Sequence, residues 1–328
     1  MHPFSYVQAD TTEAALAAFD QNKQSVFFAG GTTLVDLMKL DVMTPSELVD
    51  VNLLPFSSID AGADGVMIGA NVRNSEFAAH RVIRERYPVL SEALLAGASA
   101  QLRNMASTAG NLMQRTRCSY FRDVNAACNK RQPGSGCDAL TGVNRMHALL
   151  GTSDHCIATH PSDMCVALIA LEAVVHTQQQ NGAKRTIPLN QFYLLPGNTP
   201  QFETVLEKSE LITHVFLPDD SIHSNSHYLK VRDRSSYEFA LASAAVALEL
   251  EGKKIVNARV GLGGIGTVPW RSREAENALT GKPATQQIFA AAAQAALAGA
   301  KPQKHNAFKV ELAKRTLVLA LEELVSRA

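Results

Sequence analysis

The most constraining feature of this sequence is a polar segment that is rich in cysteine, residues 117–137 (RCSYFRDVNAACNKRQPGSGC). With a further cysteine downstream, the spacing is Cys118-x9-Cys128-x8-Cys137-x18-Cys156. Free cysteines usually lie in apolar surroundings, whereas these lie among arginines, lysines and glycines. The segment is therefore not expected to fold around a hydrophobic core of its own, and its thiols need another explanation.

Four clustered thiols indicate either a metal site or disulfide bonds. A chain without an export signal keeps its thiols reduced, so the clustering favours a metal. Zinc and iron–sulfur clusters both take four cysteine ligands, but zinc sites usually contain close C-x2–4-C pairs, which are missing here. On the residues alone, iron–sulfur and zinc remain equally good interpretations, and disulfides are a third.

Neighbouring histidines and the fifth cysteine have simpler interpretations. His147, His155 and His160 could each replace a cysteine ligand, but ordinary loop histidines are the more economical hypothesis. Cys165 lies in the apolar run MCVALIAL and is predicted to be a buried helix residue.

The overall composition argues against several classes of function. The 31 basic and 31 acidic residues cancel, which gives no indication of a nucleic-acid partner or an anionic membrane surface. No apolar run approaches the roughly 20 residues needed to span a bilayer, and residues 1–21 lack the pattern of a signal peptide. By itself the chain is expected to have no signal of its own, to be made in the cytoplasm and to have no membrane insertion.

The length of the chain, 328 residues, predicts two or three domains.

A glycine turn between a predicted strand and a predicted helix is the first indication of a ligand site. The strand is Ser25–Phe28, and the helix is indicated by apolar residues at helical spacing: Leu34, Leu37 and Met38. Gly30 and Gly31 have no Cβ, so the backbone can approach a ligand closely. With the hydroxyls of Thr32 and Thr33 and the N–H groups that begin a helix, the turn suits a diphosphate. A plain strand–helix turn is an equally good interpretation.

Two further glycine motifs follow. Residues 106–114 (ASTAGNLMQ) form a second turn of similar type, which could hold one dinucleotide from the opposite side. Residues 261–266 (GLGGIG) satisfy the G-x-G-x-x-G pattern of dinucleotide-binding proteins. However, Pro269 and Trp270 stand where a helix would have to begin, and no acidic residue follows about 20 positions on. We therefore interpret GLGGIG as the glycine-rich end of a strand.

The remaining pattern predicts a mixed chain whose composition changes near residue 225. Strands are predicted at 46–52, 65–72 and 211–218, and a hairpin turns at Asn181-Gly182. A helix is predicted to begin at Ser162 and Asp163, and residues 75–104 are expected to be mostly helical with a break at Pro88. Antiparallel strands then precede helices at about 271–280, 284–300 and 305–327.

Taken together, these motifs resemble the FAD-binding subunits of the molybdenum hydroxylases. That family includes the medium subunits of carbon monoxide dehydrogenase-like enzymes and the flavin domain of xanthine dehydrogenase. The motifs are AGGTTLVDLMK, IGANVRNSE, STAGNL, HPSDM, SELI and YLKVRDRSSYEFALASAAVAL, and they occur in family order over nearly the whole chain. The chain is most similar to the FAD subunits of bacterial periplasmic aldehyde oxidoreductases.

The resemblance implies an α+β fold. A two-part FAD-binding domain of the vanillyl-alcohol-oxidase (PCMH) type is expected over residues 1–220, with a cysteine-rich insertion at about 115–158. A smaller domain of the carbon monoxide dehydrogenase flavoprotein C-terminal type, with three antiparallel strands and a helix bundle, is expected over residues 225–328.

The resemblance also implies an oxidoreductase subunit of a heterotrimer, or of a dimer of heterotrimers. Electrons would pass from 2Fe–2S clusters of a small partner subunit through FAD to an external acceptor. The aldehyde would be oxidised at the molybdenum cofactor of a large partner subunit, so no catalytic residue is expected in this chain. Export to the periplasm together with a signal-bearing partner is implied, with the cytoplasm as the alternative.

Particular residues are assigned by the same resemblance. The residues that it implies bind FAD are Phe28, Ala29, Gly30, Gly31, Thr32, Thr33, Leu34, Ser107, Thr108, Gly110, Asn111, Asp163, Ile212 and Lys230. Arg73 and Arg103 could assist, but exposed structural arginines are expected there. A few relatives carry a 4Fe–4S cluster in the insertion, which implies Cys118, Cys128, Cys137 and Cys156 as its ligands. The rival hypotheses are a free-standing FAD or NAD oxidoreductase and a zinc-stabilised, non-catalytic assembly module.

Overall fold

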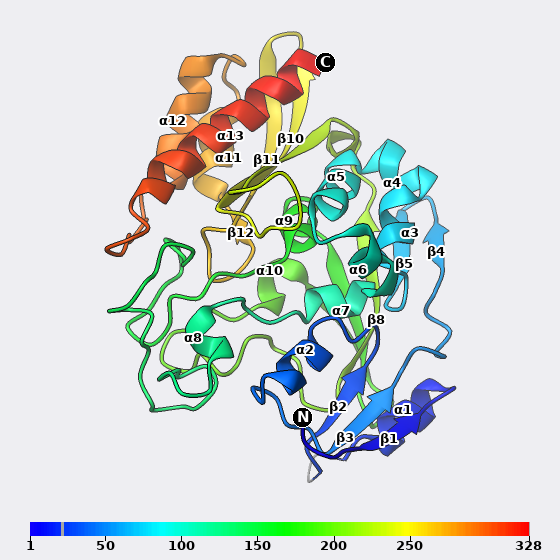
Figure 1. Cartoon of the computed structure of the whole chain (residues 1–328). Coiled ribbons are helices and arrows are strands. Elements are labelled where there is room, and N and C mark those ends of the chain that lie inside the picture. Colours follow the sequence, from blue (N-terminus) through cyan, green and yellow to red (C-terminus); the bar gives the residue numbers. More distant parts are fainter. Residues whose placement is uncertain (21–22, 328) are drawn as a thin grey trace.

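The computed structural model describes residues 1–20 and 23–327, and it has the expected mixture of helices and sheets (Figure 1). Three separate sheets organise these residues. A small parallel sheet and a five-stranded antiparallel sheet belong to the first two-thirds of the chain, and a four-stranded antiparallel sheet belongs to the last third. The α+β fold class predicted from the sequence is confirmed.

The N-terminal lobe is built on three short parallel strands. Its strands are β1 (Ser5–Gln8), β3 (Glu47–Asp50) and β2 (Ser25–Phe28), in that order across the sheet. Helix α1 (Thr12–Ala18) follows β1, and its N-cap Thr11 accepts a hydrogen bond from the backbone N–H of Ala14. Helix α2 (Leu34–Lys39) follows β2 after the glycine turn. The predicted strand–turn–helix unit is thus confirmed.

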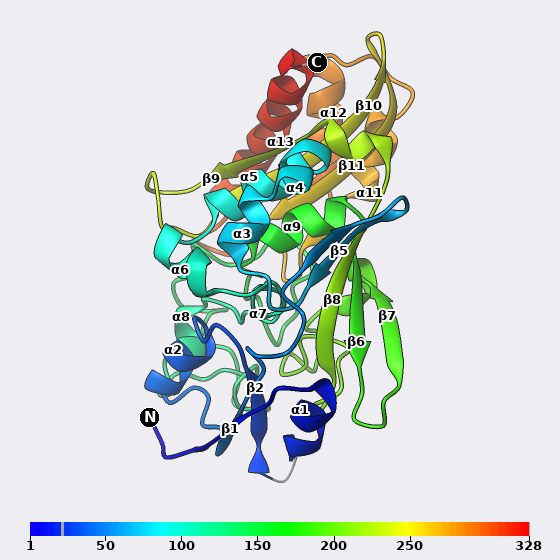
Figure 2. The same ribbon diagram turned by 90° about the vertical axis from the view of Figure 1, so that its right-hand side faces the viewer.

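The second lobe has an antiparallel sheet with strand order β4-β5-β8-β6-β7 (Figure 2). Its strands are β4 (Ile59–Ala61), β5 (Gly65–Gly69), β8 (Leu211–Pro218), β6 (Val174–Gln178) and β7 (Lys184–Pro188). The hairpin between β6 and β7 has Gly182 at φ +83° in its turn, as the Asn-Gly pair predicted. Because β8 lies between β5 and β6, this sheet joins segments that are far apart in sequence.

Helices lie in two of the connections of this sheet, between β5 and β6 and between β7 and β8. They are α3 (Asn74–Ala79), α4 (Arg81–Arg86), α5 (Pro88–Ala96), α6 (Ala100–Met105), α7 (Thr108–Leu112), α9 (Asp163–Ala170) and α10 (Leu189–Phe192). The predicted break at Pro88 is present, and the proline begins α5, where its missing N–H costs nothing. The second glycine turn is itself the start of the short helix α7.

The cysteine-rich insertion has little regular structure. Its helix α8 covers Ser119–Arg122, and isolated bridges pair Cys128 with Cys137 and Ser153 with Cys156. Figure 1 shows these loops beside α2 and below the C-terminal helices. Hydrogen bonds from polar side chains order the segment: Asn129 Nδ2 donates to the carbonyl of His155, and its Oδ1 accepts from the N–H of Gly136.

The C-terminal part combines a four-stranded sheet with three helices. After the 3-10 turn η2 (Ser221–Ser224) come β9 (Ser226–Val231), β10 (Ala242–Glu251), β11 (Lys254–Gly263) and the two-residue strand β12 (Trp270–Arg271). The helices are α11 (Arg273–Leu279), α12 (Gln286–Ala296) and α13 (Phe308–Arg327). The motif GLGGIG lies at the end of β11 and the turn after it, as predicted, and no helix begins there.

Helix α9 lies at the junction of the two parts of the chain. It packs against α5 of the second lobe and against β10 and β11 of the C-terminal sheet. Every residue from Met164 to Ala170 is buried, so the apolar run that predicted this helix reflects burial on all sides. The predicted N-cap is confirmed, because Ser162 Oγ accepts from the N–H of Cys165 at 3.1 Å.

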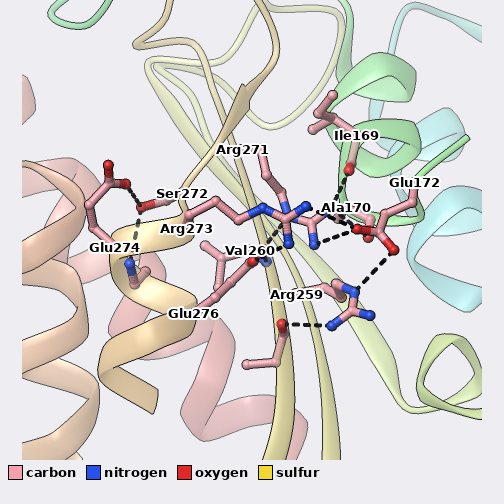
Figure 3. Close-up of polar contacts among 12 residues, drawn as sticks. Ile169, Ala170, Glu172, Arg259, Val260, Arg271, Ser272, Arg273, Glu274 and Glu276 are labelled. Carbon is pink, nitrogen blue, oxygen red and sulfur yellow. Dashed lines mark hydrogen bonds and ion pairs between the residues drawn. The ribbon is translucent and has the colours of Figure 1, made fainter. Parts of the chain in front are cut away.

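A network of arginines and glutamates holds the C-terminal end of α9 (Figure 3). The guanidinium of Arg271 donates to the carbonyl of Ile169 at 2.8 Å, and it also pairs with Glu276. Glu172, just after α9, pairs with Arg271 at 3.3 Å and with Arg273 at 3.1 Å. Glu276 is only 5% exposed, and its carboxylate pairs with both Arg271 and Arg273.

Among the described residues, no helix is both long and apolar enough to cross a membrane.

We predict that Arg271→Met lowers the free energy of unfolding by about 3 kcal/mol, because it leaves the buried carboxylate of Glu276 poorly paired and uncaps α9. Urea unfolding measures the loss. The matched control is Arg315→Met, since Arg315 is 79% exposed and pairs with Glu311 one helical turn away. That change should cost less than about 0.5 kcal/mol. Equal losses in the two variants would contradict the importance of the network.

Candidate cofactor site

A cavity of about 740 Å³ lies between the N-terminal lobe and the second lobe. It is lined by the glycine turn after β2, the segment around α7, the residues before α9 and the loop between α10 and β8. A cavity of this volume can hold a large organic ligand. The predicted residues that line it are Ala29, Gly30, Gly31, Thr32, Thr33, Leu34, Ser107, Gly110 and Ile212.

The glycine turn needs both of its glycines. Gly31 has φ +70°, a conformation that residues with a side chain rarely adopt. A Cβ on Gly30 would lie 1.9 Å from the carbonyl oxygen of Met105, so the turn lies directly against the segment that leads to α7. Because α2 has only six residues, a diphosphate would be held mainly by the N–H groups and hydroxyls of the turn rather than by a long helix dipole.

Two predicted residues of the second turn shape the cavity without lining it. Thr108 is fully buried, and its hydroxyl donates to the carbonyl of Val72 at 3.0 Å. Asn111 Oδ1 accepts a hydrogen bond from the hydroxyl of Ser162 at 2.7 Å, which ties α7 to the start of α9. Phe28 is also absent from the cavity lining. Its ring packs against the glycine turn, 2.8 Å from where a Cβ on Gly31 would be.

Asp163 and Lys230 form a buried ion pair outside the cavity lining. Lys230 Nζ lies 2.7 Å from Asp163 Oδ2, and the two side chains are only 4% and 9% exposed. The hydroxyl of Tyr228 donates to the other carboxylate oxygen at 2.6 Å. Burial, together with the nearby carboxylate, raises the pKa of Tyr228 well above its usual value. The pair joins α9 to β9, and its predicted contact with a flavin stays a prediction.

Arg73 and Arg103, the two arginines considered as possible additional FAD contacts, both donate to backbone carbonyls. Arg73 donates to the carbonyl of Met105 at 2.6 Å and to the side chain of Asn52 at 2.9 Å. Arg103 donates to the carbonyl of Gly97 at 2.7 Å. These contacts are consistent with structural roles, but both arginines are half-buried rather than exposed as expected.

Sequence reasoning missed the loop at residues 193–208, which forms one wall of the cavity. Its Tyr193 ring packs edge-on against His160 at 4.6 Å, and its hydroxyl donates to the carbonyl of Leu112 at 2.9 Å. Burial lowers the pKa of His160 to about 3, so this ring is neutral at physiological pH. The loop contains no motif that could have indicated its position.

A second, much smaller cavity lies inside the cysteine-rich insertion. Its lining includes all four clustered cysteines, Cys118, Cys128, Cys137 and Cys156. The structure therefore brings together thiols that are spread over residues 118–156. Cys165 is not among them: it is buried in α9, as predicted, and its sulfur lies 3.1 Å from the hydroxyl of Tyr193.

The donor set at the small cavity is four cysteine thiols. Four cysteines are the ligands of a four-iron cluster, in which each binds a different iron. In residues 1–20 and 23–327, no three His, Cys, Asp or Glu side chains converge closely enough to hold one metal ion. Burial raises the pKa of the Cys118 thiol to about 12, so this thiol keeps its proton near neutral pH unless a bound metal displaces it.

The three neighbouring histidines have different surroundings. His147 Nε2 lies 3.1 Å from Cys118 Sγ, within hydrogen-bond distance of that thiol. His155 lines the small cavity, where its carbonyl accepts from Asn129. His160 belongs to the large cavity.

Comparison with known proteins identifies two family domains along the chain. The sequence model described as "FAD binding domain in molybdopterin dehydrogenase" matches residues 2–220. The model described as "CO dehydrogenase flavoprotein C-terminal domain" matches residues 226–324.

Relatives of known function cover most or all of the chain. The aldehyde oxidoreductase FAD-binding subunit PaoB of Escherichia coli (strain K12) is 49% identical over 330 residues, which is 100% of both chains. The glyceraldehyde dehydrogenase medium chain of Sulfolobus acidocaldarius is 26% identical and covers 86% of this chain and 83% of its own. A solved structure of carbon monoxide dehydrogenase from Hydrogenophaga pseudoflava has a TM-score of 0.78 at 24% identity, over 100% of this chain and 99% of its own.

We predict that Gly30→Ala reduces the FAD content of the purified protein severalfold. The added Cβ would push the glycine turn away from Met105 and separate the two segments that flank the cavity. The visible flavin absorption relative to protein absorption measures the effect. Gly299→Ala is the control, because a Cβ there has no heavy atom within 4 Å. Full FAD content in Gly30→Ala would contradict the assignment of this turn.

Proposed function

This chain belongs to the family of FAD-binding subunits of the molybdopterin dehydrogenases, or molybdenum hydroxylases, and we propose that it is the electron-transfer flavoprotein subunit of an aldehyde oxidoreductase. The observation that carries the proposal is 49% identity over the full length of PaoB, which is an aldehyde oxidoreductase FAD-binding subunit. Bound FAD would supply the redox chemistry, and the residues of this chain would hold it, orient it and keep water away.

The proposal includes partner subunits. Relatives in Hydrogenophaga pseudoflava and Afipia carboxidovorans are named medium chains of carbon monoxide dehydrogenase, which supports an assembly with a small and a large chain. The small subunit would carry 2Fe–2S clusters, and the large subunit would carry the molybdenum cofactor and oxidise the aldehyde. Electrons would leave through FAD to an external acceptor. Export of the assembled complex to the periplasm stays a prediction from the sequence.

The proposal also includes a 4Fe–4S cluster in this chain, with Cys118, Cys128, Cys137 and Cys156 as its ligands. The observation that supports it is that the four thiols line one small cavity. Such a cluster would supply a one-electron carrier. The hydrogen bonds that Asn129 donates to His155 and accepts from Gly136 would hold the ligand loop in place.

Metal and flavin analysis of the purified chain tests these statements together. The proposal expects bound FAD and about four irons per chain, with an iron–sulfur absorption that bleaches on reduction. A colourless protein that contains zinc and no flavin would overturn it in favour of an assembly module. Aldehyde oxidation by the isolated chain would instead overturn its assignment as an electron-transfer subunit.

We predict that Cys128→Ser loses most of the iron, because a cluster bound by three thiolates is open to solvent and to dissociation. FAD should be largely retained, since Cys128 does not line the large cavity. The matched control is Cys165→Ser, which should keep its iron and lose only modest stability. Iron retained in Cys128→Ser and lost in Cys165→Ser would refute the ligand assignment.

A further inference from the structure

The large cavity and the cysteine cavity share part of their walls. Three of the described residues line both cavities: Lys130, Cys156 and Ala158. Lys130 is the charged member of this group, and it follows Cys128 by two positions in the sequence. A cation at this place lies close to whatever occupies either cavity.

The ammonium group of Lys130 is held in the wall by the loop that sequence reasoning missed. Nζ donates to Glu203 Oε1 at 3.0 Å and to the carbonyl of Pro200 at 2.9 Å. The side chain is only 10% exposed, so solvent screens its charge weakly. Lys130 thus reaches from the cysteine segment to a residue of the large cavity.

Glu203 is shared by two cations. Arg115 Nε lies 2.5 Å from its second carboxylate oxygen, Oε2. Burial acts to raise the pKa of Glu203, but Arg115 and Lys130 together hold it below its usual value. With this carboxylate ionised, two positive charges and one negative charge leave the group with a net positive charge.

We propose that Lys130, together with Glu203 and Arg115, sets the reduction potentials of the groups in both cavities. The inference rests on the proposed function, because it takes FAD to occupy the large cavity and an iron–sulfur cluster to occupy the cysteine cavity. A buried positive charge favours the more negatively charged, reduced form of any group beside it. Lys130 is therefore a positioning and tuning residue that carries no electrons itself.

The test uses three substitutions in the purified chain with its FAD and iron. Lys130→Gln removes the cation and should lower both reduction potentials. Lys130→Arg keeps the charge and should restore both. Glu203→Gln removes the negative charge and leaves both cations, so it should shift the two potentials upward. A redox titration followed by visible absorption and electron paramagnetic resonance measures the potentials, and metal and flavin analysis verifies the cofactor content.

Lys208→Gln is the matched control. Lys208 lines the large cavity but not the cysteine cavity, and it is exposed. Its removal should leave the iron–sulfur potential unchanged and move the flavin potential less than Lys130→Gln does.

Opposite shifts in Lys130→Gln and Glu203→Gln support the inference, since a merely structural contact would give both variants the same effect. Shifts of the same sign, unchanged potentials with full cofactor content, or loss of cofactor from both variants would overturn it. A wild-type chain without iron would overturn the proposed cluster and the cysteine half of this inference. If the wild-type chain holds FAD but no iron, an unchanged flavin potential in Lys130→Gln would also overturn the claim that Lys130 affects the potential of FAD.

Discussion

The buried ion pair between Asp163 and Lys230 is the constraint on which the arrangement of this chain depends. Because both side chains are almost fully buried, either charge without its partner would be strongly destabilising, so the pair favours the position of α9 in which Asp163 meets Lys230 of β9. The residue before Asp163, Ser162, is bonded to Asn111 of the second turn. The pair thereby fixes the C-terminal sheet to the second lobe and, through Ser162, positions one wall of the large cavity.

Glycines at the end of β11 have a packing role that explains the misleading G-x-G-x-x-G pattern. A Cβ on Gly261 would lie 2.5 Å from the carbonyl oxygen of Val166, and a Cβ on Gly263 would lie 2.5 Å from a methyl group of the same residue. Helix α9 therefore approaches this strand as closely as backbones without side chains permit. Glycine permits a positive φ in the turn at Gly31 and close packing of a helix at Gly261, and only the surrounding pattern distinguishes the two.

Local features of the fold could be predicted from the sequence because they depend on residues that are close along the chain. The cap at Ser162, the hairpin turn at Gly182 and the apolar face of α13 are of this kind. Pairing of β5 with β8 and capping of α9 by Arg271 join distant segments, and no local pattern encodes them. The same distinction holds for the candidate site. Its glycine turns have a recognisable sequence pattern, whereas the cavity wall at 193–208 and the hydrogen bond from the Thr108 hydroxyl to the carbonyl of Val72 depend on tertiary packing.

The cysteine-rich insertion is fixed from two sides, and it also has a small apolar cluster that the sequence did not lead us to expect, in which Phe121 and Cys128 pack with Leu37 of α2. Arg117 and Arg122 both pair with Asp36 of α2. On the other side, the buried Lys309 of α13 donates to the carbonyls of His147 at 2.9 Å and Gly264 at 2.6 Å. Burial lowers the pKa of this lysine to about 7, so its three carbonyl partners matter for keeping a proton there. Ion pairs with α2 on one side and hydrogen bonds from α13 on the other thus attach the insertion to two different parts of the chain.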